Sequence, residues 1–384
     1  MHLYLIQLLR AALHGKPPAA PPEDLDWRQL YTQADFHSVA CAAYYGILML
    51  TEEQQPEPEV LGLFRKAAQI VLGRETMQEY ELQHIMEELD NKGIPYMPLK
   101  GWKLKHLYPR PDMRSMCDVD ILVRQEDMKE FPAIMKESGF ELEYHGMHHD
   151  EYIKNETLSI EIHRLLFEPD SDWYEYFKSY MERTSVLDSK RQERQLPPED
   201  FYLYLIAHMA KHFRNGGTGV RSVMDVYVYQ KAYGDSLDTA YVQREFEKLG
   251  LGGFARAMEE LAQSWFAGEQ IRSDCHPKMA DYIINGGAYG LKDRGILSSV
   301  HEAGNHKGKY LLRRFFPNRH FMAAQYPCIE KAPVLLPLFW GVRAFRTVFF
   351  RRESFKREMQ TVYERDGEKR EQIEEIWKDS GLSQ

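Results

Sequence analysis

Hydrophobic and polar positions alternate at helical spacing through the first ninety residues of the chain. Leu3, Ile6, Leu9 and Leu13 open this pattern, which places apolar side chains on one face of a helix. Stretches rich in proline or acidic residues interrupt it. We therefore expect an N-terminal helical region over residues 1–90, with helices at 2–14, 36–50, 57–72 and 75–91.

The pattern changes after Gly93. The run IPYMPL (94–99) is short, bounded by glycine and proline, and predicts a strand, and VDILV (119–123) predicts a second. Between 152 and 167 the chain resembles a hairpin, because LSIEIH alternates as a half-buried strand does. A short helix after residue 100 and a helix ending at Gly139 complete a small mixed α/β core, which we place at residues 91–187.

A polar run, DSKRQERQLPPED (188–200), is the best candidate for a linker. Helical patterns resume beyond it and predict a C-terminal helical domain over residues 198–384. The expected fold class is therefore α+β, with a small mixed sheet flanked by helical regions. The predicted C-terminal helices begin with 201–213 and 221–234, continue with a pair over 238–267, and end with 353–379.

The longest apolar stretch is VLLPLFWGV (334–342), and four arginines follow it, at 343, 346, 351 and 352. It is far too short to span a bilayer. A basic, aromatic helix can lie on a membrane surface, but we expect this one to be buried against neighbouring helices with its arginines at the rim. The N-terminal segment lacks a basic stretch before its apolar run, and Arg10 interrupts that run. Both features argue against a signal peptide.

Charge and cysteine content narrow the functional classes. The 49 lysines and arginines against 58 aspartates and glutamates give a net charge of −9, which argues against general attraction to nucleic acid or an anionic membrane. The four cysteines are scattered and form no CxxC pair, which favours reduced thiols over disulfides or structural zinc. We expect a cytoplasmic protein that binds neither membrane nor DNA.

The chemistry concentrates in residues 99–124. Asp118 and Asp120 lie two apart at the start of a predicted strand, so their carboxylates share one face. Two carboxylates held together repel each other unless a cation lies between them, and hard divalent ions prefer oxygen ligands. The pair therefore indicates a Mg²⁺ site.

Neighbouring residues add a phosphate-binding context. Lys100 and Gly101 stand at a strand-to-helix junction, where backbone N–H groups can approach an anion, and Arg114 can neutralise phosphate charge. Glu161 and His163 share a face of the later strand. If that strand lies antiparallel beside the first, Glu161 becomes a third carboxylate, which is the arrangement of two-metal phosphoryl transfer.

These residues carry a resemblance to known proteins. The order of strand, glycine turn, helix, Asp-x-Asp strand and later carboxylate strand resembles the nucleotidyltransferase fold of the DNA polymerase β type. The run KG…YP…R…DVDILV, with IEIH downstream, is more similar to the family of uncharacterised nucleotidyltransferases. The resemblance continues into segments typical of its flanking helices, at 26–48, 205–212 and 221–229.

The resemblance implies Mg²⁺-dependent transfer of a nucleoside monophosphate from an NTP such as ATP, with release of pyrophosphate. Asp118 and Asp120 match the metal-binding pair, Glu161 the third carboxylate and Gly101 the turn glycine; two ions are expected, and Mn²⁺ can replace Mg²⁺. The chain departs from the pattern at Trp102, where a serine hydroxyl normally follows the glycine, and in a longer interval to the Asp-x-Asp pair. These departures leave open a shifted phosphate site, an unusual donor or lost catalysis.

Other polar residues have a structural and a functional interpretation. His208 and His212 have metal-compatible spacing on a helix, but the zinc-protease pattern is absent and packing is favoured. Arg221 and Asp225 are expected to pair along one helix. In the functional interpretation, helices 201–230 close over the nucleotide and bring Lys211, His212 or Arg221 near phosphate or base.

The histidines at 145, 148 and 149 are expected in a solvated hairpin loop, with acceptor binding as the alternative. The leading hypothesis for the whole chain is an enzyme, a nucleotidyltransferase with an unknown hydroxyl acceptor. A small molecule or a protein hydroxyl is favoured over RNA. The alternatives are a catalytically inactive nucleotide-binding regulatory protein and a metal-dependent phosphohydrolase.

Overall fold

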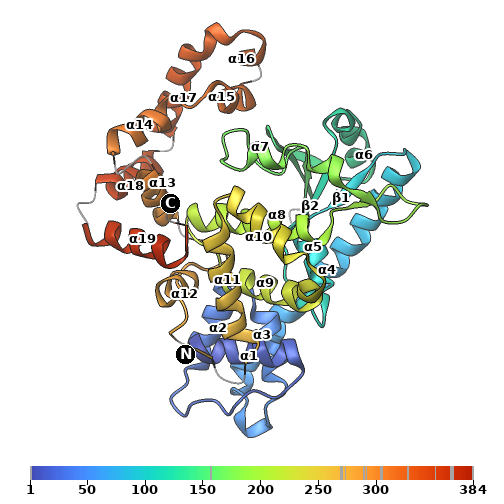
Figure 1. Ribbon diagram of the computed structural model, residues 1–384, viewed down its shortest axis with the longest axis vertical. Coiled ribbons are helices and arrows are strands. Elements are labelled where there is room, and N and C mark those ends of the chain that lie inside the picture. The colour runs from blue at the N-terminus through green and yellow to red at the C-terminus, as the bar shows by residue number, and fades with distance from the viewer. Residues whose placement is uncertain are drawn as a thin grey trace.

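Figure 1 shows the computed structural model of the chain, in which a small sheet lies among many helices. The structure describes residues 2–155, 158–268, 271–272, 274–288, 290, 292–302, 306–326, 328–350, 352–363 and 367–382.

The helices occupy both ends of the described chain. Those before the end of the sheet are α1 (His2–His14), α2 (Trp27–Phe36), α3 (Ala40–Ile47), α4 (Pro58–Asn91), α5 (Lys100–Lys105) and α6 (Phe131–Glu137). Those after it are α7 (Tyr174–Phe177), α8 (Pro198–Arg214), α9 (Val220–Tyr233), α10 (Thr239–Lys248), α11 (Gly252–Phe266), α12 (Pro277–Ile284), α13 (Lys292–Glu302), α14 (Lys307–Phe315), α15 (Arg319–Gln325), α16 (Cys328–Lys331), α17 (Leu336–Phe350), α18 (Arg352–Tyr363) and α19 (Gly367–Asp379).

The central sheet has five strands in the order β1-β2-β5-β4-β3, and β2 pairs parallel with β5 whereas the other neighbours pair antiparallel. The strands are β1 (Tyr96–Pro98), β2 (Asp118–Val123), β3 (Glu141–His145), β4 (His149–Lys154) and β5 (Leu158–His163). The β4–β5 hairpin and both strands predicted before it are confirmed. The mixed sheet with flanking helices confirms the α+β class.

The two faces of the sheet have different surroundings. Val119, Ile121 and Val123 alternate along β2 onto the face that packs against α4 and α6. Leu122 points the other way, toward the helices that follow the sheet in sequence. Alternation puts Asp118 and Asp120 on the same face of the sheet as Leu122. This polar face is therefore turned toward the C-terminal helices.

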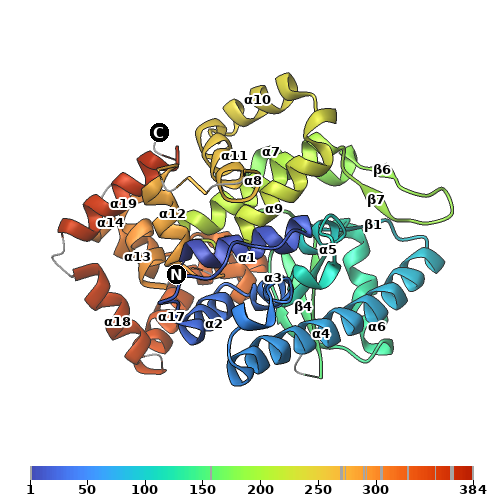
Figure 2. The same ribbon diagram turned by 90° about the horizontal axis from the view of Figure 1, so that it is seen from below.

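Helix α4 is one continuous helix, so the predicted break between residues 72 and 75 is wrong. Its first half packs with the N-terminal helices through Val60 and Phe64, and its second half packs under the sheet through residues such as Leu82 and Leu89. Residues 70–77, which contain the predicted break, lie between these two hydrophobic clusters, and Ile70, Leu72 and Met77 are exposed there. Figure 2 shows the helix running along the sheet.

The predicted helix 36–50 is also wrong in its bounds, because α2 ends at Phe36 and α3 begins at Ala40. His37 and Ser38 separate them, and Ser38 has a left-handed backbone with φ of +55°. Helix α1 packs against both α3 and α11, so one hydrophobic core joins the N-terminal helices to α8, α9 and α11. The division into regions at residues 90 and 198 stays a prediction.

The polar run at 188–200 is not only a linker. It includes β7 (Arg194–Gln195), which pairs with β6 (Ser185–Val186), and Glu193 forms a bridge to Tyr96 of β1. Arg191 also donates to Asp90 at the end of α4, at 3.0 Å. These contacts hold the segment against the sheet, although its composition is that of a loop.

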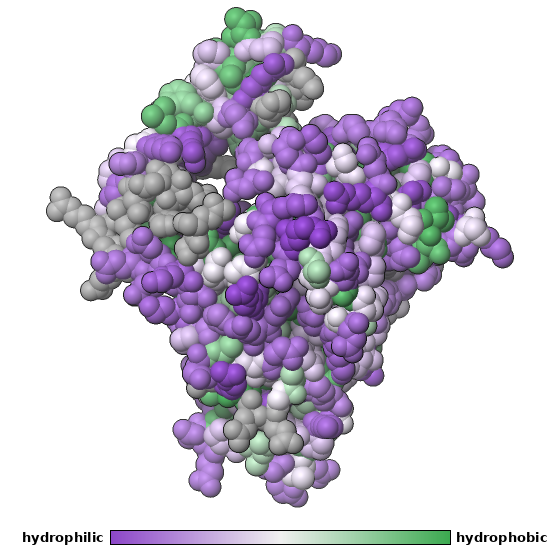
Figure 3. Space-filling view, viewed as in Figure 1, coloured by the Kyte–Doolittle hydropathy of each residue, from purple (hydrophilic) through white to green (hydrophobic). Residues whose placement is uncertain are grey.

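The apolar segment 334–342 forms the start of α17, but the expectation that it is buried is wrong. Leu338 is 63% exposed and Phe345 is 55% exposed. The helix is attached on one side, where Trp340 donates to Pro317 O at 3.0 Å and Arg343 to Arg314 O at 2.6 Å. Figure 3 shows hydrophobic groups on this projecting part of the molecule.

Within the part of the chain that the structure describes, every helix is too short or too polar to cross a lipid bilayer.

His37 makes a testable link between the two ends of the chain. Its Nε2 lies 2.8 Å from Ile284 O at the end of α12, and its Nδ1 accepts from Val220 N–H of α9 at 3.4 Å. Burial lowers the pKa of this imidazole to about 4. Between pH 6.5 and pH 4 the unfolded chain therefore binds a proton that the folded chain excludes, and the free energy of unfolding falls by about 3 kcal/mol as pH falls.

We predict that His37→Gln, which removes this titration, makes the decline in unfolding free energy between pH 6.5 and pH 4 shallower than in the wild type. Urea unfolding at several pH values measures the difference. Parallel curves for the two proteins would show that folding leaves the pKa of His37 unchanged, which would contradict this prediction.

Candidate active site

The site is built on the register between β2 and β5, in which Asp120 lies directly beside Glu161. The two strands are parallel, so the antiparallel arrangement expected from the sequence is wrong. The carboxylates nevertheless meet, because parallel partners in register present their side chains on the same face of the sheet. Asp118 and Asp120 therefore share a face with Glu161, as predicted.

Lys100 enters this face from the start of α5. Its Nζ donates to Asp120 Oδ1 at 2.9 Å, and its backbone φ is +37°, which is unusual for a residue other than glycine. Burial lowers the pKa of Lys100, but the charge of Asp120 outweighs it and raises the pKa above its ordinary value. A permanent cation thus lies against the second aspartate of the pair.

His163 joins the two strands. Its Nε2 lies 2.8 Å from Asp120 Oδ1 and 3.0 Å from Glu161 Oε2. Burial lowers the pKa of this imidazole, but the hydrogen bonds to the two carboxylates outweigh it and raise the pKa. Burial alone would raise the pKa of Asp120; Lys100 and His163 hold it well below its usual range.

Negative charge is crowded on this face. Glu151 of β4 is the register partner of Glu161, and it accepts a hydrogen bond from Ser159 at 2.9 Å. Desolvation, followed by the charge of Asp120, raises the pKa of Asp118 to about 6, although the Asp118 side chain is exposed. Sequence analysis missed Glu151, because only pairing of β4 with β5 reveals that it faces Glu161.

The donor set fits a divalent cation. Ligand atoms of Asp120, Glu161 and His163 lie within 4.8 Å of one another. Two carboxylates and an imidazole suit ions such as Mn²⁺ as well as Mg²⁺. A cation here would also relieve the repulsion that raises the pKa of Asp118.

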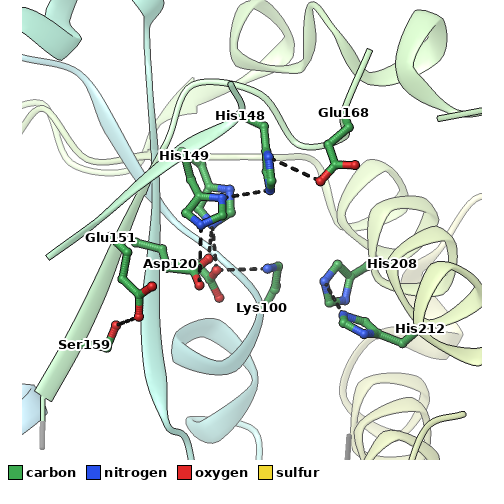
Figure 4. A network of polar contacts seen from close by, with 11 residues as sticks. Lys100, Asp120, His148, His149, Glu151, Ser159, Glu168, His208 and His212 are labelled. Carbon is green, nitrogen blue, oxygen red and sulfur yellow. Dashed lines mark hydrogen bonds and ion pairs between the residues drawn. The ribbon is translucent and has the colours of Figure 1, made fainter. Parts of the chain in front are cut away.

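Two of the three hairpin histidines lie in the site, so their expected place in a solvated loop is wrong. His149 is the register partner of His163, and His148 precedes it. His149 Nδ1 lies 2.8 Å from His148 Nε2, and Figure 4 shows the His149 ring beside Asp120 and the His148 ring between His149 and Glu168. His145, by contrast, is 58% exposed and contacts Asp150.

Helix α8 supplies the opposite wall. Figure 4 shows His208 and His212 across from Lys100, and their Nε2 atoms lie 3.1 Å apart. Desolvation, followed by the charges of Lys100 and Lys211, lowers the pKa of His212 to about 4, although the residue is exposed. Burial likewise lowers the pKa of Lys211.

The Arg114 side chain is largely buried, so it does not lie where a phosphate ligand is expected. It forms a two-pronged ion pair with Asp225 of α9, with both N–O distances at 2.8 Å, and Tyr108 donates to the same carboxylate at 2.7 Å. Arg221 donates from Nη1 to Ser115 O at 2.6 Å. The sequence predicted Arg221 as the partner of Asp225. In the structure Arg114, which is distant in sequence, binds the Asp225 carboxylate.

A family model described as "Uncharacterised nucleotidyltransferase" matches residues 23–267, which is well over half of the chain. The chain belongs to this family of uncharacterised nucleotidyltransferases. The resemblance inferred from residues 99–124 and 160–163 is therefore confirmed. The matched range includes the whole sheet and helices α8 to α11, and α12 to α19 lie beyond it.

No curated protein matches the chain. Among solved structures, the antibiotic-resistance factor ANT(2'')-Ia, determined in solution, matches with 13% sequence identity and a TM-score of 0.35. The match covers 45% of this chain and 93% of that chain. A likeness this distant transfers no substrate to the present nucleotidyltransferase family member.

The turn glycine of this nucleotidyltransferase serves packing as well as backbone freedom. A Cβ added to Gly101 would lie 2.4 Å from Arg114 Nη1 and 2.5 Å from Met116 Sδ. The next residue, Trp102, is buried, and Lys105 Nζ lies 3.6 Å from the centre of its ring. The position that holds a serine in related folds is therefore a core position here, with no hydroxyl to offer.

We predict that Gly101→Ala destabilises the protein by about 1–3 kcal/mol, because the new methyl group displaces Arg114 from its ion pair with Asp225. Urea unfolding measures the change. Gly62→Ala in α4 is the matched control: nothing lies within 4 Å of its added Cβ, so it should be neutral or stabilising by up to about 1 kcal/mol. Equal effects of the two substitutions would contradict the packing role of Gly101.

Proposed function

We propose that the protein transfers a nucleoside monophosphate from an NTP to a hydroxyl acceptor in a Mg²⁺-dependent reaction. One observation carries the proposal: Asp120 and Glu161 are register partners on parallel strands, with Lys100 against the first. Membership of a nucleotidyltransferase family supports transfer as the reaction class. The acceptor oxygen would attack the α-phosphorus, and pyrophosphate would leave.

Asp118, Asp120 and Glu161 are the residues that would hold Mg²⁺. Bound there, one or two ions supply charge neutralisation of the triphosphate and a lower pKa for the acceptor hydroxyl. Glu161 is also placed to accept the proton of that hydroxyl, as a general base. His163 positions both carboxylates through its Nε2 contacts.

The cationic groups around this face suit a triphosphate. Lys100 can exchange its contact with Asp120 for a phosphate oxygen, because an ammonium group donates to either anion. Lys211 and His212 of α8 lie on the opposite wall and can meet phosphate or base. Arg114 and Arg221 act as positioning residues beneath Gly101 and Ser115.

The net charge of the chain bears on the class of acceptor. With a net charge of −9, we favour a small hydroxylated molecule or a protein side chain over RNA, and we expect no DNA.

We predict that Asp118→Asn and Asp120→Asn each lower NTP turnover on the order of a thousandfold, because loss of a carboxylate removes metal charge from the transition state. Pyrophosphate release from ATP, GTP, CTP and UTP measures turnover and identifies the donor. Asp235→Asn is the control, since Asp235 is exposed in the short 3-10 turn that follows α9. Wild-type turnover by either site variant would refute the assignment.

We also predict that Lys100→Met changes the affinity for Mg²⁺ alone and the affinity for the Mg²⁺–NTP complex in opposite directions. Loss of the ammonium removes a cation that competes with Mg²⁺ for Asp120, so Mg²⁺ alone should bind about tenfold more tightly. The Mg²⁺–NTP complex should bind about tenfold more weakly, because one phosphate contact is lost. Thermal midpoints in titrations with Mg²⁺, with and without NTP, measure both affinities. A change in the same direction for both would contradict this role.

A nucleotide-binding protein without turnover is the second candidate. It is favoured by Trp102, which leaves the turn without a hydroxyl, and by the two donors that already occupy Asp120 Oδ1. This candidate predicts a thermal shift with Mg²⁺–NTP that Asp118→Asn abolishes, but no pyrophosphate release from any of the four NTPs.

A further inference from the structure

A second group of metal-binding side chains borders the carboxylates. One ring nitrogen from each of His148, His149 and His163 lies within 4.8 Å of the others. The sheet fixes two of these rings, because His149 and His163 are direct register partners on β4 and β5. The ring centres of His149 and His163 are 5.1 Å apart, and those of His148 and His149 are 4.2 Å apart.

His148 and His149 share a proton that a metal ion bound to both rings would replace. A bond between His148 Nε2 and His149 Nδ1, at 2.8 Å, requires one nitrogen to carry a proton and the other to be bare. At least one ring is therefore neutral. His163 is 4% exposed, and its Nδ1 is buried without a hydrogen-bond partner among the described residues. A buried imidazole nitrogen without a partner requires an explanation.

The surroundings resemble those of a histidine-ligated metal. His148 presents Nε2 toward the cluster, and its Nδ1 lies 3.5 Å from Glu168 Oε1. A carboxylate on the far nitrogen of a ligating histidine is the usual device that fixes ring orientation.

We propose that His148, His149 and His163 form a binding site for a divalent transition metal such as Zn²⁺ or Co²⁺, next to the oxygen-ligated Mg²⁺ site. Imidazole nitrogen is preferred by these ions, whereas Mg²⁺ prefers oxygen and retains water. Three protein nitrogens with an open fourth position match the coordination of zinc. The site shares His163 with the carboxylate face, and it requires no nucleotide.

Titration of the metal-free protein with Co²⁺, in the presence of millimolar Mg²⁺, tests this site. Visible absorption reports nitrogen ligation of Co²⁺, and metal analysis after dialysis gives the stoichiometry. We expect one Co²⁺ per chain in the wild type. His148→Gln and, separately, His149→Gln should weaken Co²⁺ binding tenfold or more. His145→Gln, an exposed histidine of the same hairpin, should bind Co²⁺ as the wild type does.

Circular dichroism and thermal melting establish that each variant is folded. Asp118→Asn distinguishes the two sites, because it should lose NTP turnover and keep Co²⁺ binding. The proposal is overturned if His148→Gln and His149→Gln both bind Co²⁺ like the wild type. It is also overturned if Asp118→Asn loses Co²⁺ binding, because the ion would then lie among the carboxylates. Loss of Co²⁺ binding in His212→Gln alone would likewise overturn it, because the ion would then lie on α8.

Discussion

Electrostatic repulsion between carboxylates on neighbouring strands is the constraint on which the site depends. Glu161 has Asp120 beside it on one strand and Glu151 on the other. Two like charges about 4 Å apart cost about 4 kcal/mol near a protein surface, so such an arrangement persists only with compensation. In this structure Lys100 and His163 supply part of it by sharing Asp120 Oδ1, and Asp118 supplies part by a raised pKa. A divalent cation on this face would supply the rest.

The hydrophobic cores turn the charged face of the sheet toward α8. Helix α4 covers one side of the sheet with apolar side chains, so the carboxylates can point only to the other side. There α8 is held by a core that contains helices from both ends of the chain. The ion pair between Arg114 and Asp225 ties the segment before β2 to α9. The wall formed by α8 is thus fixed relative to the sheet by packing and by a buried charge pair.

Several features were predictable from the sequence because their cause is local. Period-two alternation identified β2 and β5 and put Asp118 with Asp120, and Glu161 with His163, on shared faces. The parallel pairing of β2 with β5 was not predictable, because strand direction depends on how the intervening hairpin folds back. His148 and His149 escaped detection because the polar sequence around them is typical of a loop, and only pairing with β5 turns them inward.

The sequence by itself determined the family, the strands β1, β2 and β5 and the residues that carry charge, because these follow from residue type and short-range periodicity. The tertiary structure decided which charges meet: Lys100 with Asp120, Glu151 with Glu161, and Arg114 with Asp225. It also left α17 exposed, where hydrophobicity alone predicted burial. The physical reason is that burial and ion pairing depend on which surfaces come together, and residues far apart in the sequence supply those surfaces.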